Sequence, residues 1–348
     1  MKKKVFNIIS GNKSGALNIA MDLGDYLQAQ GYEINTIFRK YNNTELKDVI
    51  VIKDRCTLDY VVGLAKLINE AKPNIILVHG YSTHLWTKMA VAFAKVDVKL
   101  IHIEHNAEQY TLLRSWLVKK LDQYTDQYIC VSKGVANNLL KQGVTEEKVS
   151  VIYNGIDIEK FNIQKELHQV YTIGMTARFS KQKDQMTLIK AVELLNKQNV
   201  KLQLIFVGGG KTKKKCEEYV QKNHLQNAIC FKTGKFIDII PQLDLFVLST
   251  HFEGLPLVLC EAMAAGIPVI GTNVIGVDEI ICDNNVGFLT EENNIIELSD
   301  KIRALISYHK TEKEKSIISF AHNLVNEKFN KKDMLEKYKN KIAELNIK

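Results

Sequence analysis

The sequence has no long apolar run and few arginines, and both absences limit what the protein can do. Its 348 residues include no run of 18 apolar residues, the length that a membrane-spanning helix needs. The apolar stretch near the start ends after five residues, too short for a secretory signal. Only five of the 47 basic residues are arginine, on which nucleic-acid readers usually depend. The net charge of +8 allows an anionic partner, but we expect a cytoplasmic protein that binds no nucleic acid.

The six cysteines show no metal or redox pattern. No two are spaced as C-x-x-C, and none stands beside a histidine at zinc-site spacing. Most lie inside apolar runs, so we interpret them as buried thiols in a reducing compartment. The composition, 46% apolar and 25% charged, excludes a disordered, collagenous or membrane-spanning chain.

Short apolar runs alternate with segments of helical periodicity along almost the whole chain. Continuous apolar strands between helices are typical of a parallel sheet covered on both faces. The predicted strands are 5–9, 34–38, 74–78, 99–103, 127–131 and 149–153 in the first half, and 171–176, 201–208, 228–232, 244–249 and 267–272 in the second.

A polar, unpatterned segment at 161–170 interrupts the alternation, which then restarts. The sequence therefore predicts an α/β protein of two doubly wound domains, with ligands at the carboxyl ends of the strands. We expect an N-terminal Rossmann-like domain at 1–165 and a C-terminal one at 166–328. The lysine-rich end, 329–348, is predicted as a helix that packs back toward the N-terminal domain.

Two carboxylates flank a predicted helix start in the segment 249–266. Pro256 suits the first helical position, and Gly266 ends the helix. Glu253 precedes the helix, whereas Glu261 lies inside its apolar sequence and should therefore have a hydrogen-bonding partner. Spacing alone leaves two interpretations open. One is a solvated loop glutamate plus a structural ion pair; the other is two acceptors for sugar hydroxyls beside a helix N-terminus that receives a diphosphate.

A second polar segment follows the first strand of the second domain. Arg178 lies at the end of that strand, Lys183 follows five residues later, and Asp184 is placed to cap the next helix. Two cations at this place would neutralise a diphosphate without a metal. A solvated surface loop, with Lys181 facing solvent, is the alternative.

The loop after the first strand contains Gly11 and opens a helix at Gly15. This geometry can cradle a phosphate, although a plain strand–helix connection fits as well. At a later strand end, His102 and Glu104 share one face and His105 follows. The sequence alone allows two interpretations of His105: a core histidine whose hydrogen bonds are satisfied, or a residue of the active site.

The histidines near these strand ends, His79, His102 and His105, together with Glu104, offer no metal-ligand set at fixed spacing. We therefore expect no metal here.

Taken together, these segments resemble the family 4 glycosyltransferases of the GT-B fold. The E-x7-E element of Glu253 and Glu261, with its Glu-Gly-Leu-Pro and Glu-Ala-Met flanks, is similar to the signature of that family. The segment 177–184 is similar to its Arg…Lys phosphate clamp, and 130–135 and 153–161 match two further elements in the same order. The resemblance covers roughly residues 5–345.

The resemblance implies two doubly wound Rossmann-like domains facing across a cleft. It implies retaining transfer of a hexose-type sugar from a nucleotide-diphosphate sugar to a saccharide or lipid-linked saccharide, in cell-surface polysaccharide biosynthesis. By this resemblance Glu253 holds donor-sugar hydroxyls, Glu261 holds the ribose, and His105 lies near the anomeric centre. The implied catalytic residues are Arg178, Lys183, Glu253 and His105; the implied donor-binding residues are Gly15, Arg178, Lys183, Gly208, Glu253, Gly254, Leu255, Pro256 and Glu261.

Three positions depart from the family pattern. Ala177 replaces the usual glycine, 208–210 lacks an acidic residue, and 10–15 lacks paired glycines followed by an acid. The last departure leaves the acceptor side unassigned. The chain has no D-x-D motif, so we expect no metal and no cofactor beyond the nucleotide sugar as co-substrate.

Four alternatives remain. A non-catalytic nucleotide-sugar-binding subunit and a sugar-nucleotide epimerase of the same fold would both keep the site residues. A nicotinamide-dependent oxidoreductase would need G-x-G-x-x-G, which 11–15 does not supply. Nucleic-acid binding would depend on 211–215, which fits a solvated helix start.

The segment 110–124 predicts a helix with one apolar stripe. Lys120 falls inside the stripe, which suits either a core helix with a snorkelling lysine or contact with an anionic membrane. With the family resemblance, we predict peripheral association with the inner face of the cytoplasmic membrane. The stripe is Leu112, Leu113, Trp116, Leu117, Leu121 and Tyr124, flanked by Arg114 and Lys119.

Overall fold

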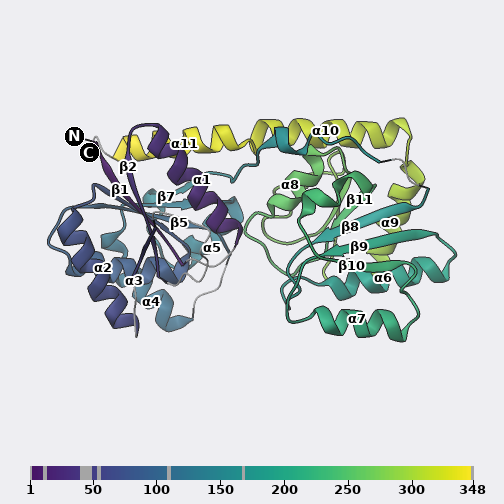
Figure 1. Cartoon of the computed structure of the whole chain (residues 1–348), viewed down its shortest axis with the longest axis horizontal. Helices are drawn as coiled ribbons and strands as arrows, with labels where there is room; N and C mark the ends of the chain where they lie inside the picture. Colours follow the sequence, from purple (N-terminus) through teal and green to yellow (C-terminus); the bar gives the residue numbers. More distant parts are fainter. Residues whose placement is uncertain are drawn as a thin grey trace. The chain divides into compact units, whose positions relative to one another are not determined.

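The computed structural model describes residues 2–10, 14–39, 49–52, 56–107, 111–166 and 169–345. It divides into two compact units, each drawn in Figure 1. Unit 1 is Met1–Asn154 with Asp333–Lys348, and unit 2 is Gly155–Lys332. Each unit is an α/β fold around one parallel sheet, as the sequence predicts.

Unit 1 contains a sheet of seven parallel strands in the order β3-β2-β1-β4-β5-β6-β7. The strands are β1 (Lys4–Ile9), β2 (Glu33–Phe38), β3 (Val49–Val51), β4 (Ile75–His79), β5 (Lys99–Glu104), β6 (Gln127–Cys130) and β7 (Val149–Val151). The helices are α1 (Gly15–Ala29), α2 (Thr57–Ala71), α3 (Tyr81–Phe93), α4 (Leu112–Lys120), α5 (Lys133–Lys141) and α11 (Lys331–Leu345).

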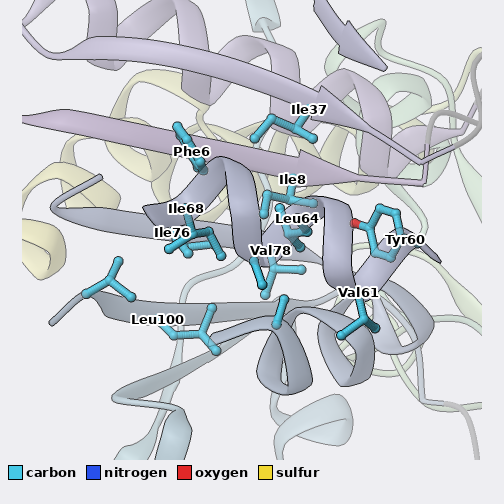
Figure 2. Packing of buried hydrophobic residues seen from close by; sticks show 13 residues of the cluster. Phe6, Ile8, Ile37, Tyr60, Val61, Leu64, Ile68, Ile76, Val78 and Leu100 are labelled. Carbon is cyan, nitrogen blue, oxygen red and sulfur yellow. The ribbon is translucent and has the colours of Figure 1, made fainter. Parts of the chain in front are cut away.

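The core of unit 1 lies on both faces of this sheet. On one face, Phe6 and Ile8 of β1 pack against α2, whose Tyr60, Leu64 and Ile68 are fully buried (Figure 2). On the other face, a smaller cluster of Ile9, Leu17, Ala20 and Phe38 joins β1 and β2 to α1. Since side chains alternate along a strand, burial of both faces explains why the strands read as continuous apolar runs.

Unit 2 contains six parallel strands in the order β10-β9-β8-β11-β12-β13. The strands are β8 (Tyr171–Thr176), β9 (Leu202–Val207), β10 (Ile229–Lys232), β11 (Leu245–Leu248), β12 (Val269–Thr272) and β13 (Phe288–Thr290). The helices are α6 (Gln185–Lys197), α7 (Lys213–Lys222), α8 (Leu257–Ala264), α9 (Ile295–Tyr308) and α10 (Glu312–Lys328).

The units divide at 154/155, about ten residues before the boundary expected from the sequence. The reason is hydrogen bonding inside unit 2. The backbone N–H of Ile156 donates to the carbonyl of Phe329 at 2.8 Å, and that of Glu166 donates to Pro241 at 2.8 Å. The residues after 154 are therefore built into the second unit before its first strand begins.

Both sheets reverse their strand order once, in unit 1 between β1 and β4 and in unit 2 between β8 and β11. In open parallel sheets this reversal opens a crevice at the carboxyl ends of the two strands, where ligands bind. The residues that follow β8 and β11 are those that the sequence marks as site candidates.

Candidate active site

The loops that follow β8 and β11 are hydrogen-bonded to one another. The backbone N–H of Asp184 donates to Ser249 at 3.0 Å, and that of His251 donates to Gln182 at 2.9 Å. The Gln182 side chain adds a bond to the carbonyl of Phe252 at 2.7 Å. Asp184 also caps α6, as predicted, by accepting from the Thr187 N–H at 3.2 Å. The chain therefore fixes both loops at the reversal point of the sheet.

Lys183 and Glu253 form an ion pair across these two loops. Both side chains are largely buried, at 14% and 9% exposure. Thr250 donates a second hydrogen bond to the same Glu253 oxygen, Oε1, at 2.7 Å. Lys183 is therefore held in the crevice by the carboxylate, and the two residues that the sequence singles out are in direct contact.

Arg178 is exposed at the end of β8. Its backbone carbonyl accepts from the Gln185 side chain at 3.0 Å, which anchors the main chain. Within the described ranges, no hydrogen bond or ion pair reaches its guanidinium group. Arg178 is therefore a cation that can meet an anionic ligand without breaking a protein contact.

Helix α8 begins directly beyond the buried segment 254–256, which holds Gly254, Leu255 and Pro256. Pro256 is the N-cap residue, so the helix starts one residue later than predicted, and no side chain among the described residues caps the first turn. Gly276 supports this loop: its φ is +82°, and a Cβ there would lie 2.2 Å from the Gly254 carbonyl oxygen. The uncapped N–H groups of a helix start attract anions, so the start of α8 adds a positive element to the loop that follows β11.

Glu261 corrects one expectation. No hydrogen bond or ion pair to its carboxylate exists among the residues that the structure describes, although the sequence predicts a partner. Burial without a partner raises the pKa of Glu261 to about 7. Glu261 is half-buried, so its carboxyl group can accept hydrogen bonds from a hydroxylated ligand.

The raised pKa makes the stability of unit 2 depend on pH. The folded chain keeps the Glu261 proton up to about pH 7, whereas the ordinary pKa of a glutamate carboxyl is 4.5. The contribution of Glu261 to the free energy of unfolding is therefore fully present below pH 4.5 and lost as the pH rises through 7. We expect the stability gained by Glu261→Gln to be about 2–3 kcal/mol larger at pH 8 than at pH 5. Urea denaturation of both proteins at both pH values measures this, and an equal difference at the two values would contradict it.

Gly208 has a structural role at the end of β9. Its φ is +142°, and a Cβ there would lie 2.2 Å from the carbonyl oxygen of Ala177. Glycine at 208 thus lets the β9 loop approach the residue before Arg178.

Gly15 is the exposed first residue of α1, and Ser14 caps that helix by accepting from the Leu17 N–H at 3.2 Å. A Cβ at Gly15 would meet no atom within 4 Å among the described residues. Packing of unit 1 therefore does not require glycine at this position. Gly11, the other glycine of the predicted loop, lies outside the described residues.

His105 follows β5 at the carboxyl edge of the unit 1 sheet and is 8% exposed. Its Nε2 lies 3.0 Å from Nδ1 of His79, and its backbone N–H donates to Glu104 at 3.0 Å. Burial lowers the pKa of His105 to about 4, so the ring is neutral at pH 7. Sequence reasoning considered His79 only as a metal ligand and missed its contact with His105.

Two family models match the chain. The model described as "Glycosyl transferases group 1" matches residues 157–323, and "Glycosyltransferase Family 4" matches residues 13–160.

An uncharacterized glycosyltransferase of Methanocaldococcus jannaschii is 29% identical over 293 residues, covering 79% of this chain and 80% of the relative. A UDP-Gal:alpha-D-GlcNAc-diphosphoundecaprenol alpha-1,3-galactosyltransferase of Escherichia coli is 23% identical, covering 81% and 82%. Other relatives carry names from capsular polysaccharide, amylovoran and colanic acid biosynthesis.

The fold is shared with a solved structure, Anabaena HepE in complex with UDP. The TM-score is 0.86 at 20% identity, with 98% of this chain and 100% of that chain covered.

Proposed function

The chain belongs to the group 1, family 4-like glycosyltransferases of the GT-B fold, and on this premise we propose that it transfers a hexose from a UDP-sugar to a lipid-linked saccharide. One observation carries the proposal: Arg178, Lys183 and the start of α8, which no side chain of the described residues caps, all follow β8 or β11, the strands between which the unit 2 sheet reverses its order. A diphosphate is the ligand that suits three positive elements in one crevice.

The choice of donor and acceptor draws on the relatives. HepE binds UDP, and the Escherichia coli relative uses UDP-Gal and a diphosphoundecaprenol-linked sugar. In our proposal Glu261 accepts the ribose hydroxyls, and Glu253 accepts hydroxyls of the sugar. The product is a cell-surface polysaccharide, in line with the names of the other relatives.

The proposed reaction breaks the bond between the anomeric carbon and the diphosphate and forms a bond to the acceptor oxygen on the same face. The acceptor proton passes to the leaving phosphate, so the anomeric configuration is retained without a protein nucleophile. Negative charge grows on the leaving group, which Arg178, Lys183 and the α8 start stabilise. Because these groups supply the positive charge, we propose that no metal is required.

The test is to incubate the purified chain with UDP-glucose, UDP-galactose and UDP-N-acetylglucosamine, with and without a lipid-diphosphate-linked sugar. We expect acceptor-dependent UDP release in EDTA, and an NMR assignment of the product linkage that retains the donor configuration. Nucleotide binding with no turnover would favour a non-catalytic subunit. Conversion of the donor sugar without acceptor would favour an epimerase.

Our proposal for the location of the reaction rests on α4. Leu113 and Trp116 are 68% and 54% exposed, and the Lys120 ammonium lies 4.9 Å from the Trp116 ring centroid. Helix α4 spans only Leu112–Lys120, and its buried residue is Val118. The predicted stripe is therefore exposed at Leu113 and Trp116 and half-buried at Leu117, Leu121 and Tyr124, and the two exposed residues favour the membrane interpretation. No helix in the described ranges could span a membrane.

We propose that α4 docks unit 1 on an anionic membrane. An exposed tryptophan and leucine flanked by Arg114, Lys119 and Lys120 suit the headgroup region. In liposome co-sedimentation, changing those three cations together to Gln is expected to lower binding to anionic vesicles by at least tenfold, since each cation contributes about 1 kcal/mol.

The matched control changes three exposed lysines of unit 1 outside α4, Lys66, Lys95 and Lys141, to Gln. It removes the same charge and should leave most binding intact. If the parent stays in the supernatant with anionic vesicles, or if both triple variants bind equally, α4 is not the docking element.

A further inference from the structure

Four groups of unit 1 form a continuous hydrogen-bonded chain that ends at His105. The Asn7 side-chain Nδ2 donates to the carbonyl of Ala20 in α1 at 2.8 Å. Asn7 Oδ1 lies 2.9 Å from His79 Nε2, and His79 Nδ1 lies 3.0 Å from His105 Nε2. Asn7 and His79 are 0% and 2% exposed, so water does not compete for these bonds.

The backbone carbonyl of Ala20 determines which atom donates and which accepts in every hydrogen bond from Asn7 to His105. A carbonyl only accepts, so the Asn7 atom that faces Ala20 must be the NH₂ group. The other Asn7 atom is then an oxygen, which also only accepts, and His79 must carry its proton on Nε2. A neutral His79 therefore accepts at Nδ1, and His105 must donate from Nε2.

We propose that Asn7 and His79 are positioning residues that hold His105 as the Nε2–H tautomer, so that its unprotonated Nδ1 is a hydrogen-bond acceptor of fixed direction. No hydrogen bond from the described residues reaches His105 Nδ1. The tautomer follows from unit 1 alone, whereas its role in the reaction depends on the proposed function.

The surroundings keep the two histidines of this hydrogen-bonded chain, His79 and His105, in their neutral form. Burial holds the pKa of His79 well below its usual range, with further lowering by His105 and His102. The ionisable groups acting on His105 from β5 are Glu104, which raises its pKa, and His102, which lowers it. Gly24 of α1 leaves room for the amide, since a Cβ there would lie 3.2 Å from Asn7 Nδ2.

The direct test is to observe the side-chain nitrogens of histidine in ¹⁵N-labelled protein by NMR, with assignments from His79→Asn and His105→Asn. We expect both His79 and His105 to carry their proton on Nε2 at pH 7. A proton on Nδ1 of His105, or averaging between the two nitrogens, would overturn the proposal. The experiment requires no substrate and no activity, so it is independent of the proposed function.

The second test is Asn7→Leu, which keeps the side-chain size and removes the amide that fixes the polarity. The control is Thr36→Val, at the β2 position paired with Asn7, which likewise replaces a buried polar group. We expect Asn7→Leu to abolish the single His105 tautomer and to lower kcat/KM by about ten- to a hundredfold, as loss of an orienting partner does elsewhere. The Kd for UDP, which we propose that unit 2 binds, should stay within about twofold, because the substitution lies in unit 1.

The control should keep both the tautomer and the rate. If Asn7→Leu folds and His105 retains one Nε2–H tautomer, the amide does not set it and the proposal is wrong. If Asn7→Leu fails to fold, the spectrum of the parent protein decides. If His105 has one fixed tautomer but the protein turns over no UDP-sugar, the positioning by Asn7 and His79 is supported and the proposed function is wrong.

Discussion

Changing Arg178 or Lys183 to Ala is expected to lower kcat by roughly 10²–10³, equivalent to about 3 kcal/mol for one donor lost from a charged transition state. Both cations lie where the unit 2 sheet reverses, and in the proposed reaction the diphosphate gains negative charge as the sugar leaves. The two variants should differ in stability. Arg178 is exposed and has no partner in the described ranges, so its loss should change the free energy of unfolding by less than about 0.5 kcal/mol. Lys183→Ala leaves the largely buried Glu253 carboxylate without its cation, so it should lower the free energy of unfolding by more than Arg178→Ala does.

Lys181 is the matched control, because it is an exposed cation in the same loop. Lys181→Ala should retain the parent rate. The measurements are steady-state kinetics with a UDP-sugar and urea denaturation for each protein. If Arg178→Ala and Lys183→Ala both work within threefold of the parent, the diphosphate is bound elsewhere.

The parallel sheets could be predicted from the sequence because their strands are buried on both faces. Continuous apolar runs then mark β1, β4, β8 and β11 clearly, and the Asp184 cap of α6 is visible as a single residue before a periodic segment. Two strands, β3 and β13, are missed. Each has only three residues and lies at a sheet edge. The apolar run 49–52 could nevertheless have revealed β3, as the run 149–153 revealed the equally short β7.

The site residues could be located but their contacts could not. Lys183 and Glu253 are 70 positions apart, and their pairing depends on β8 lying beside β11. The absence of a described partner for Glu261 is likewise a property of the packed helix, since an apolar helix sequence only shows that a partner is needed. The Asn7–His79–His105 chain joins β1, β4 and the end of β5. Only the strand order brings those residues together.

The glycine loop after β9 shows the same limit, because Gly208 and Gly209 are equivalent in the sequence and different in the structure. At Gly208 φ is +142° and a Cβ would lie 2.2 Å from the Ala177 carbonyl oxygen, whereas a Cβ at Gly209 meets no described atom within 4 Å. We therefore expect Gly208→Ala to destabilise the protein by about 2–4 kcal/mol, and Gly209→Ala to change stability by less than about 0.5 kcal/mol. Urea denaturation of the pair measures the contrast.

The contrast should also extend to activity. The Ala177 N–H donates to Val207 at 3.1 Å and the Phe179 N–H donates to Gly209 at 2.9 Å, so the β9 loop holds the main chain on both sides of Arg178. A Cβ at 208 must push the Ala177 carbonyl away, and Arg178 moves with it. Because a displacement of about 1 Å in a positioned group costs on the order of 10² in rate, Gly208→Ala should lose most of its kcat even at temperatures where it remains folded. Gly209→Ala should keep the parent rate. Equal stability and equal kcat in the two variants would show that the β9 loop does not position Arg178.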